Sequence, residues 1–242
     1  MKSSLLSQAG VTHQVFGRPY NFRYQTQQEH LARDVRRALA VLGELPDMIY
    51  SGEQCHGNQI AYADGMSGES FIIGRQFSET DGLITDKPGV ALMIKFADCT
   101  PLVFYDPVKQ VLACVHSGWR GTVQHIAANA VERMTRDFGC VLSDILVYVG
   151  PSIDQAHYEV GPEVYDAFAS VGSRDQYFQP QGDKYRLSMV DANVAILRQL
   201  GFQSSQLDIC RASTVTDPTL HSARQEGPAY GLNALIAMLP TI

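Results

Sequence analysis

The chain of 242 residues is 45% hydrophobic and contains 11 Tyr and 10 Phe, a composition that excludes wholesale disorder. Only 18% of its residues are charged, and the formal net charge of −6 argues against a general nucleic-acid binder. At roughly 150 residues per domain, this length corresponds to one large domain or two small ones.

No apolar run in the sequence approaches the roughly 20 residues that a helix needs to span a bilayer. The first residues carry one cation and too short an apolar stretch for a secretory signal. We therefore expect a cytoplasmic protein that does not associate with membranes. The 5 cysteines are an odd number, and in a reducing compartment we expect thiols unless one is reactive or binds a metal.

The spacing of apolar residues predicts helices and strands scattered along the whole chain. Leu31, Val35 and Leu39 fall on one face of the first predicted helix, which Gly43 ends. In chain order, the predicted elements are a helix at 29–42, strands at 48–50, 59–63, 82–85, 90–97, 102–105 and 111–115, a helix after 116–121, a strand at 144–149, helices at 163–171 and 188–200, a strand at 207–210 and a closing helix at 230–239.

No linker, charge block or fixed-period repeat divides the chain, so we expect a single domain over residues 1–242. Several strands are continuous apolar runs, which is typical of strands that are buried on both faces. Helices among such strands predict a layered α/β or α+β fold.

Polar residues that could bind a metal or take part in catalysis follow the ends of these apolar strands. Asp98 and Cys99 follow one strand, His116 follows another, and His56 lies in a loop bounded by glycines. Two imidazoles and a thiolate suit Zn²⁺, and three protein ligands leave the fourth tetrahedral position for water or substrate. The wide spacing matches no short ligand signature, so a buried cysteine and two hydrogen-bonded histidines are the plainer interpretation.

A cysteine hydrolase is a second interpretation of the same residues. Cys99 would be the nucleophile, His116 the base, and Asp98 or Asp81 the residue that orients the base. A metal would compete with this role, because one thiolate does not readily serve as both ligand and nucleophile.

The segment Gly118-Trp119-Arg120-Gly121-Thr122 is predicted to open a helix that Thr122 caps. Free backbone amides at a helix start and the Arg120 side chain could bind phosphate. Arg224 is a second candidate cation. The plainer interpretation is that Trp119 packs on the core and that both arginines lie on the surface.

Two further side chains are candidates for the pocket. Gln54 could donate and accept hydrogen bonds near His56, or it could stabilise its own loop. Asp81 stands in Thr80-Asp81-Gly82 and is either a turn residue or part of the pocket lining.

Five segments together resemble the YfiH-like family, long labelled multicopper polyphenol oxidase or laccase domain and later understood as zinc-dependent purine nucleoside phosphorylases. The resemblance covers roughly residues 48 to 165. Its motifs stand in the order Gln54-Cys55-His56-Gly57, Thr80-Asp81-Gly82-Leu83-Ile84-Thr85, Ala97-Asp98-Cys99-Thr100-Pro101, Val115-His116-Ser117-Gly118-Trp119-Arg120-Gly121-Thr122 and Val149-Gly150-Pro151-Ser152-Ile153.

The resemblance implies that His56, Cys99 and His116 are zinc ligands in a mixed α/β domain of layered sheets and helices, active as a monomer. It implies phosphorolysis of adenosine, inosine and methylthioadenosine, with adenosine deamination as a side activity. Purine nucleoside and phosphate would be the partners, and copper could replace zinc. On this hypothesis Cys99, Asp98 and Arg120 serve catalysis, and the expected substrate-binding residues are Gln54, Asp81, Thr122, Ser222 and Arg224.

The resemblance is weaker at both ends of the chain. Residues 10–17 stand where many members have a Thr-Arg-x-Gly-Gly-x-Ser segment. Residues 221–227 stand where many carry a Ser-Tyr-Arg-Arg-like stretch, and they retain Ser222 and Arg224 but not the second arginine. These differences affect substrate choice and leave the three expected metal ligands unchanged.

Two other functions compete with the phosphorylase. A copper-dependent polyphenol oxidase could use the same His56, Cys99 and His116 site, because copper outcompetes zinc at such ligands. However, 7 histidines without His-x-His pairs are too few for a conventional multicopper set. A non-enzymatic binding domain with a structural zinc is the other alternative, and an open coordination position argues against it.

Overall fold

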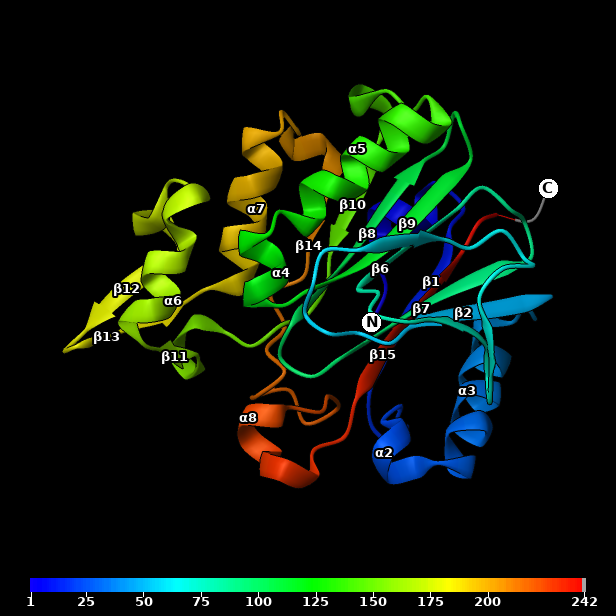
Figure 1. Ribbon diagram of the computed structural model, residues 1–242, viewed down its shortest axis with the longest axis horizontal. Coiled ribbons are helices and arrows are strands. Elements are labelled where there is room, and N and C mark those ends of the chain that lie inside the picture. The colour runs from blue at the N-terminus through cyan, green and yellow to red at the C-terminus, as the bar shows by residue number, and fades with distance from the viewer. Residues whose placement is uncertain (241–242) are drawn as a thin grey trace.

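A computed structural model describes residues 1–240 as two six-stranded sheets packed face to face, with helices on both outer faces (Figure 1). Three apolar clusters fill the spaces between these four layers. This arrangement confirms the predicted mixed α/β fold of layered sheets and helices. The α-helices are α1 (Ser4–Gln8), α2 (Tyr24–Gln27), α3 (Glu29–Leu42), α4 (Trp119–Val123), α5 (Ile126–Phe138), α6 (Pro162–Ala167), α7 (Met189–Gln199) and α8 (Ala223–Glu226).

The first sheet has the strand order β1-β15-β7-β2-β5-β4. Its central strand β7 pairs antiparallel with β15 and parallel with β2, and α3 covers its outer face. The strands of this sheet are β1 (Thr12–Phe16), β2 (Met48–Gly52), β4 (Glu69–Phe71), β5 (Gly74–Phe77), β7 (Val90–Phe96) and β15 (Asn233–Met238).

The second sheet has the strand order β14-β10-β8-β9-β6-β3, and α5 and α7 cover its outer face. Along β8, Leu102 and Phe104 pack toward these helices, whereas Val103 and Tyr105 pack toward the first sheet. This alternation explains why the strand is apolar throughout, because both of its faces are buried. The strands are β3 (Ile60–Tyr62), β6 (Gly82–Thr85), β8 (Thr100–Asp106), β9 (Val111–Ser117), β10 (Leu146–Val149) and β14 (Leu207–Ile209).

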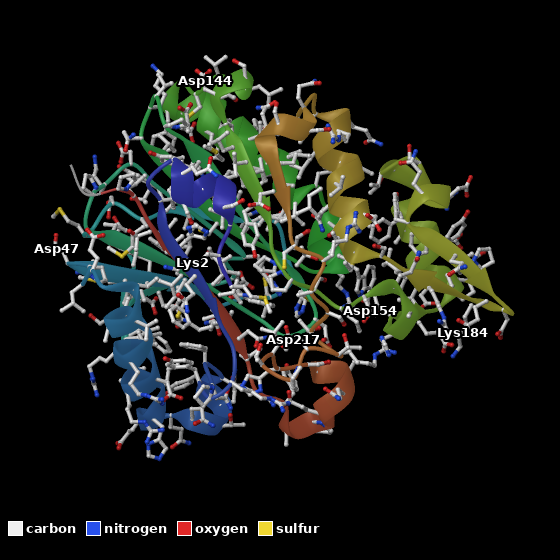
Figure 2. All side chains as sticks on the ribbon, turned by 180° about the vertical axis from the view of Figure 1, so that it is seen from behind. Lys2, Asp47, Asp144, Asp154, Lys184 and Asp217 are labelled. Atoms are coloured by element: carbon white, nitrogen blue, oxygen red, sulfur yellow. The ribbon has the colours of Figure 1, made fainter. Side chains whose placement is uncertain are left out.

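A small third sheet projects from one end of the molecule, and sequence reasoning did not predict it. Figure 2 shows Lys184 near the tip of its hairpin and Asp47 on the opposite side of the molecule. The sheet consists of β11 (Glu159–Val160), β12 (Phe178–Gln181) and β13 (Lys184–Leu187). Among residues 1–240, no helix is long and apolar enough to cross a membrane.

The predicted closing helix at 230–239 is wrong, because these residues form β15 in the interior of the first sheet. All six residues of β15 are buried between β1 and β7, so the apolar run reflects burial on both faces rather than helical periodicity. The sequence analysis also missed β1, which pairs with β15 from Thr12 to Phe16.

The predicted cap at Thr122 is also wrong. Gly118 is the N-cap of α4, and Thr122 lies inside that helix with its hydroxyl donating to the Gly118 carbonyl oxygen at 2.9 Å. A second helix, α5, begins after His125. Ser188 does cap α7 as the sequence suggests, since its side chain accepts a hydrogen bond from the Asp191 backbone amide.

The chain crosses from one sheet to the other between β7 and β8, and Asp98 and Cys99 lie at this crossing. His56 follows β2 of the first sheet, and His116 lies near the end of β9 in the second. Both sheets therefore contribute to one small region at their common edge.

Candidate metal centre and its pocket

His56, Cys99 and His116 converge in space although they are distant in the sequence. Each offers one ligand atom, and these atoms lie within 4.8 Å of one another. The two imidazole rings meet edge to face with their centroids 5.1 Å apart. Within residues 1–240 no other group of three or more His, Cys, Asp or Glu side chains has this arrangement.

The Asp81 carboxylate connects the two histidines from behind. It accepts hydrogen bonds from the backbone amides of Cys55, His56 and Gly57 at 2.8 to 3.0 Å. Its Oδ1 also lies 2.8 Å from Nδ1 of His116. Because Nδ1 of His116 is engaged in this way, Nε2 is the nitrogen left for a metal.

The electrostatics of the cluster favour charged groups despite burial. Burial raises the pKa of Asp81, but hydrogen bonds from His116 and the loop amides outweigh this effect and hold its pKa at about 2. Burial likewise raises the pKa of the Cys99 thiol, and the adjacent His116 and His56 bring it down to about 6. Burial lowers the pKa of His116, whereas Cys99 and Asp81 raise it to about 9.

The backbone around the cluster is built for close approach. A Cβ on Gly118 would lie 2.9 Å from Cδ2 of His56 and 3.0 Å from Sγ of Cys99, so only glycine leaves room there. His56 and Asp98 have positive φ angles of 63° and 81°, which non-glycine residues adopt rarely. Such conformations concentrate at functional sites, where the surrounding contacts hold them.

The donor set fits a zinc ion. Two neutral imidazoles and a thiolate are common zinc ligands, and tetrahedral coordination by three protein groups leaves one open position. An open position at the edge of a cavity is typical of a catalytic site rather than a closed structural one.

A cavity of about 420 Å³ reaches all three residues. Aromatic side chains from α2, β4 and the segment before β15 form much of its wall. Its lining comprises Phe22, Arg23, Tyr24, Gln25, Glu53, Gln54, His56, Phe71, Gln76, Lys95, Phe96, Ala97, Cys99, His116, Tyr230 and Leu232.

Gln54 lines this cavity, but both ends of its amide bind the chain. Its Nε2 donates to the Lys95 carbonyl oxygen at 2.7 Å, and its Oε1 accepts from the Lys95 amide at 2.9 Å. The Gln54 side chain thus fastens the loop that carries His56 to strand β7.

Asp98, Arg120 and Arg224 gather with Cys99 around the half-buried Tyr158. Burial raises the pKa of Tyr158, and Cys99 and Asp98 act in the same direction while Arg224 and Arg120 act against it. The guanidinium carbon of Arg224 lies 5.5 Å from the Tyr158 ring centroid, and Arg120 stacks on Trp119 at 4.3 Å. This places two cations beside the triad, outside the lining of the 420 Å³ cavity.

The Asp98 carboxylate is engaged on both oxygens. It accepts from the Thr214 hydroxyl at 2.6 Å and from the Arg224 backbone amide at 2.7 Å. Thr122 and Ser222 are buried, and neither lines the cavity. Ser222 caps α8 by accepting from the Gln225 amide.

Sequence reasoning missed the cavity residues Arg23, Lys95 and Tyr230 as site candidates. Arg23 donates to the carbonyl oxygens of Pro228 and Tyr230 and lies over the Tyr230 ring at 4.0 Å. Lys95 carried a usable signal, because it interrupts the otherwise apolar strand β7. Arg23 and Tyr230 carried none, because their pairing joins the two ends of the chain.

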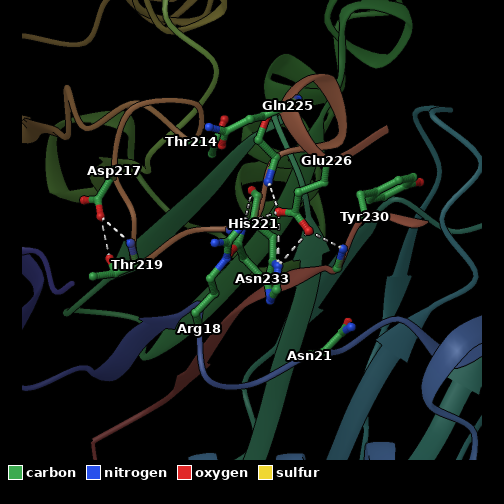
Figure 3. A network of polar contacts seen from close by, with 12 residues as sticks. Arg18, Asn21, Thr214, Asp217, Thr219, His221, Gln225, Glu226, Tyr230 and Asn233 are labelled. Atoms are coloured by element: carbon green, nitrogen blue, oxygen red, sulfur yellow. Dashed lines mark hydrogen bonds and ion pairs between the residues drawn. The ribbon is translucent and has the colours of Figure 1, made fainter. Parts of the chain in front are cut away.

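A polar network holds the segment that contains Tyr230 (Figure 3). Glu226 accepts from the amides of Ser222 and Gly231 and from the Arg18 guanidinium, each within 3.1 Å, and it faces Nδ1 of His221 at 3.3 Å. The opposite nitrogen of His221 meets the Tyr20 carbonyl oxygen at 2.7 Å. The network therefore ties one wall of the cavity to the N-terminal segment.

The chain belongs to the family described as multi-copper polyphenol oxidoreductase laccase, which matches residues 6–240. It also shares its fold with hypothetical protein YfiH of Bacillus licheniformis, with a TM-score of 0.87 and 27% identity over 95% of this chain and 92% of that one. These findings confirm the resemblance to YfiH-like proteins.

Curated relatives include a purine nucleoside phosphorylase of Bacteroides thetaiotaomicron, which is 31% identical over 84% of this chain and 77% of that protein. Purine nucleoside phosphorylase YlmD of Bacillus subtilis is 36% identical over 66% of this chain and 59% of its own length. Adenosine deaminase RL5, from an unknown prokaryotic organism, is 32% identical over 80% of this chain and 76% of that protein.

Proposed function

We propose that this chain is a zinc-dependent purine nucleoside phosphorylase that cleaves adenosine, inosine and methylthioadenosine with phosphate, with adenosine deamination as a side activity. The observation that carries the proposal is the convergence of His56, Cys99 and His116 at a cavity large enough for a nucleoside. The phosphorylase and deaminase relatives support it.

The metal site would be His56, Cys99 and His116. Zinc held by these residues would supply a Lewis acid able to polarise and orient a bound group. Asp81 holds both histidines in place through the hydrogen bonds described above. Gln54 fixes the His56 loop against β7 and shapes the cavity floor.

The two arginines near Cys99 supply the charge that phosphate needs. Arg120 and Arg224 are both exposed, and both act on Tyr158 beside the metal ligands. Guanidinium groups bind phosphate oxygens through paired hydrogen bonds. Asp98 acts as a positioning residue in this scheme, because it holds the backbone of Arg224 through a hydrogen bond of 2.7 Å.

The aromatic walls of the cavity suit the purine base. Phe22, Tyr24, Phe71 and Tyr230 line it together with the triad, and flat aromatic faces bind bases by stacking. The nucleoside would then lie between the aromatic wall and the phosphate near the arginines. We propose that the enzyme works as a monomer in the cytoplasm.

A nucleoside panel with and without phosphate tests the function. We expect wild-type protein to release free base from adenosine and inosine only with phosphate, as measured by chromatography. The Cys99→Ala variant should lose this release, whereas Cys210→Ala, a change at a half-buried cysteine outside the triad, should keep it. Base release that survives in Cys99→Ala contradicts the assignment.

A copper-dependent polyphenol oxidase is a second candidate, favoured by the family description. Metal analysis of protein purified without added copper distinguishes the two. Stoichiometric copper, with oxygen consumption on phenols that Cys99→Ala abolishes, would support the oxidase. Stoichiometric zinc without phenol oxidation would support the phosphorylase.

A further inference from the structure

Lys95 is a half-buried cation in a strand where every other residue is apolar. In β7 the burial is complete from Val90 to Ile94 and at Phe96, and only Lys95 is half-buried. Its side chain lines the cavity that contains the triad and the aromatic wall. A lysine in such a position costs folding free energy, because its charge loses hydration.

The structure holds Lys95 firmly while leaving its ammonium group partly free. The Gln54 amide binds both the amide and the carbonyl oxygen of Lys95. Nζ donates to the Gly52 carbonyl oxygen at 3.0 Å, and no carboxylate among residues 1–240 forms an ion pair with it. An ammonium has three donors, so two are left for a molecule in the cavity.

The surroundings make Lys95 ready to give up its proton. Burial lowers its pKa to about 8, although the negative charges of Glu53 and Asp81 act in the opposite direction. Besides Glu53, the other titratable or charged groups that line the cavity are Arg23, Tyr24, His56, Cys99, His116 and Tyr230. An acid whose pKa lies near the working pH is the most effective proton donor.

We propose that Lys95 is a catalytic residue that donates its proton to the departing purine, an assignment that rests on the proposed phosphorylase function. The bond between N9 and C1′ breaks, and its electron pair moves into the base. A phosphate oxygen forms the new bond to C1′, and the proton of Nζ goes to N7 of the base. The phosphate ester then loses its own proton, which restores the ammonium group of Lys95.

The position of the arginines favours the base rather than phosphate as the partner of Lys95. Arg120 and Arg224 lie near Tyr158 and outside the cavity lining, whereas Lys95 lies among the aromatic side chains. In a displacement at C1′, the nucleophile and the leaving base occupy opposite faces of the sugar. A lysine inside the cavity and two arginines outside its lining suit this requirement.

The test compares inosine with 7-methylinosine in one preparation of each variant. The methyl group fixes positive charge on the imidazole ring, so that base leaves without receiving a proton at N7. For Lys95→Met we expect kcat/KM to fall by roughly 10²–10⁴-fold on inosine, the range that acid catalysis supplies, and by less than about tenfold on 7-methylinosine. Any misfolded fraction cancels in this comparison, since both substrates meet the same protein.

Two further variants complete the experiment. Lys95→Gln replaces Lys95→Met if the methionine variant does not fold, and the same ratio is expected. Lys109→Met, a change at an exposed lysine, should leave kcat/KM unchanged for both substrates. Equal losses on both substrates, or a rise in the KM for phosphate with both, would overturn the proposal. Absence of phosphate-dependent cleavage in the wild type would instead refute the proposed function.

Discussion

Asp81 shows how one buried side chain can organise a site without entering it. Its carboxylate receives three consecutive backbone amides and an imidazole, so it fixes both the His56 loop and the His116 ring. An asparagine of the same shape keeps one acceptor oxygen but turns the other oxygen into an NH2 donor, which would face backbone amides or the imidazole instead of accepting from them. Groups that orient metal ligands in this way contribute strongly to affinity.

Asp81→Asn should therefore weaken zinc binding by about 10–100-fold. Competition with a chromophoric chelator measures this affinity directly. Asp86→Asn serves as the control, because Asp81 directly precedes β6 and Asp86 directly follows it, but Asp86 pairs with Lys87 and Tyr62 near the surface. An unchanged affinity in Asp81→Asn would show that the carboxylate does not position the ligands.

Residue types at strand ends marked the side chains of the triad as candidates, and the family resemblance implied that they share one metal. His56, Cys99 and His116 stand beside apolar runs, and rigid strands carry such residues to a common edge. Asp81 carries no comparable signal, since a Thr-Asp-Gly segment reads equally well as a turn. Its role depends on a loop 24 to 26 residues earlier in the chain, a separation that local patterns do not report.

At the scale of elements, α8 and the segment that follows it depend on one acidic side chain. Glu226 accepts hydrogen bonds from Ser222, Gly231 and Arg18 (Figure 3). Burial raises its pKa, but these donors outweigh that effect and lower the pKa to about 2 from the ordinary 4.5. A carboxylate with a lowered pKa stabilises the folded state only while it is ionised.

Glu226→Gln should lower the free energy of unfolding by about 2 kcal/mol at pH 7. The difference from wild type should be complete above pH 4.5 and should vanish as the pH falls toward 2, where the native carboxylate is protonated as well. Denaturant titrations of both proteins across this range check the prediction. A difference that stays constant down to pH 2 would contradict it.

The prediction of elements failed where burial replaced periodicity. The apolar run of β15 contains Ala, Leu and Met, which favour helices when they are taken alone. Pairing with β1 and β7 overrides this preference, and no local sequence pattern indicates which strands β15 pairs with. By contrast, α3 was predicted with its observed bounds, because the apolar residues of a surface helix recur with a 3.6-residue period that can be recognised in the sequence.

For the whole molecule, two sheets and three apolar clusters form the core, so we expect the fold to persist when the metal is removed. Chelation should therefore leave the far-ultraviolet circular dichroism unchanged. The melting temperature should fall by about 5–10 °C relative to protein at a zinc concentration 100 times Kd, which corresponds to about 2.7 kcal/mol of binding free energy. Loss of secondary structure on chelation would indicate a structural zinc instead.

Alkylation before and after chelation distinguishes a cysteine that binds zinc from one that is a free nucleophile. Cys55 is exposed and should react in any state, so peptide mass mapping has to locate the label. A coordinated Cys99 should become labelled only after chelation. Rapid labelling of Cys99 in untreated, zinc-loaded protein would favour the cysteine hydrolase.

The place of β15 has a consequence for biosynthesis. The strand comes late in the chain, yet it lies between β1, made near the beginning, and β7. During translation an edge of β7 stays without its neighbour until residue 238 has left the ribosome. Nascent chains thus expose an apolar strand to chaperones or to one another. A product terminated before residue 233 lacks β15, and we expect its catalytic cavity to be disordered.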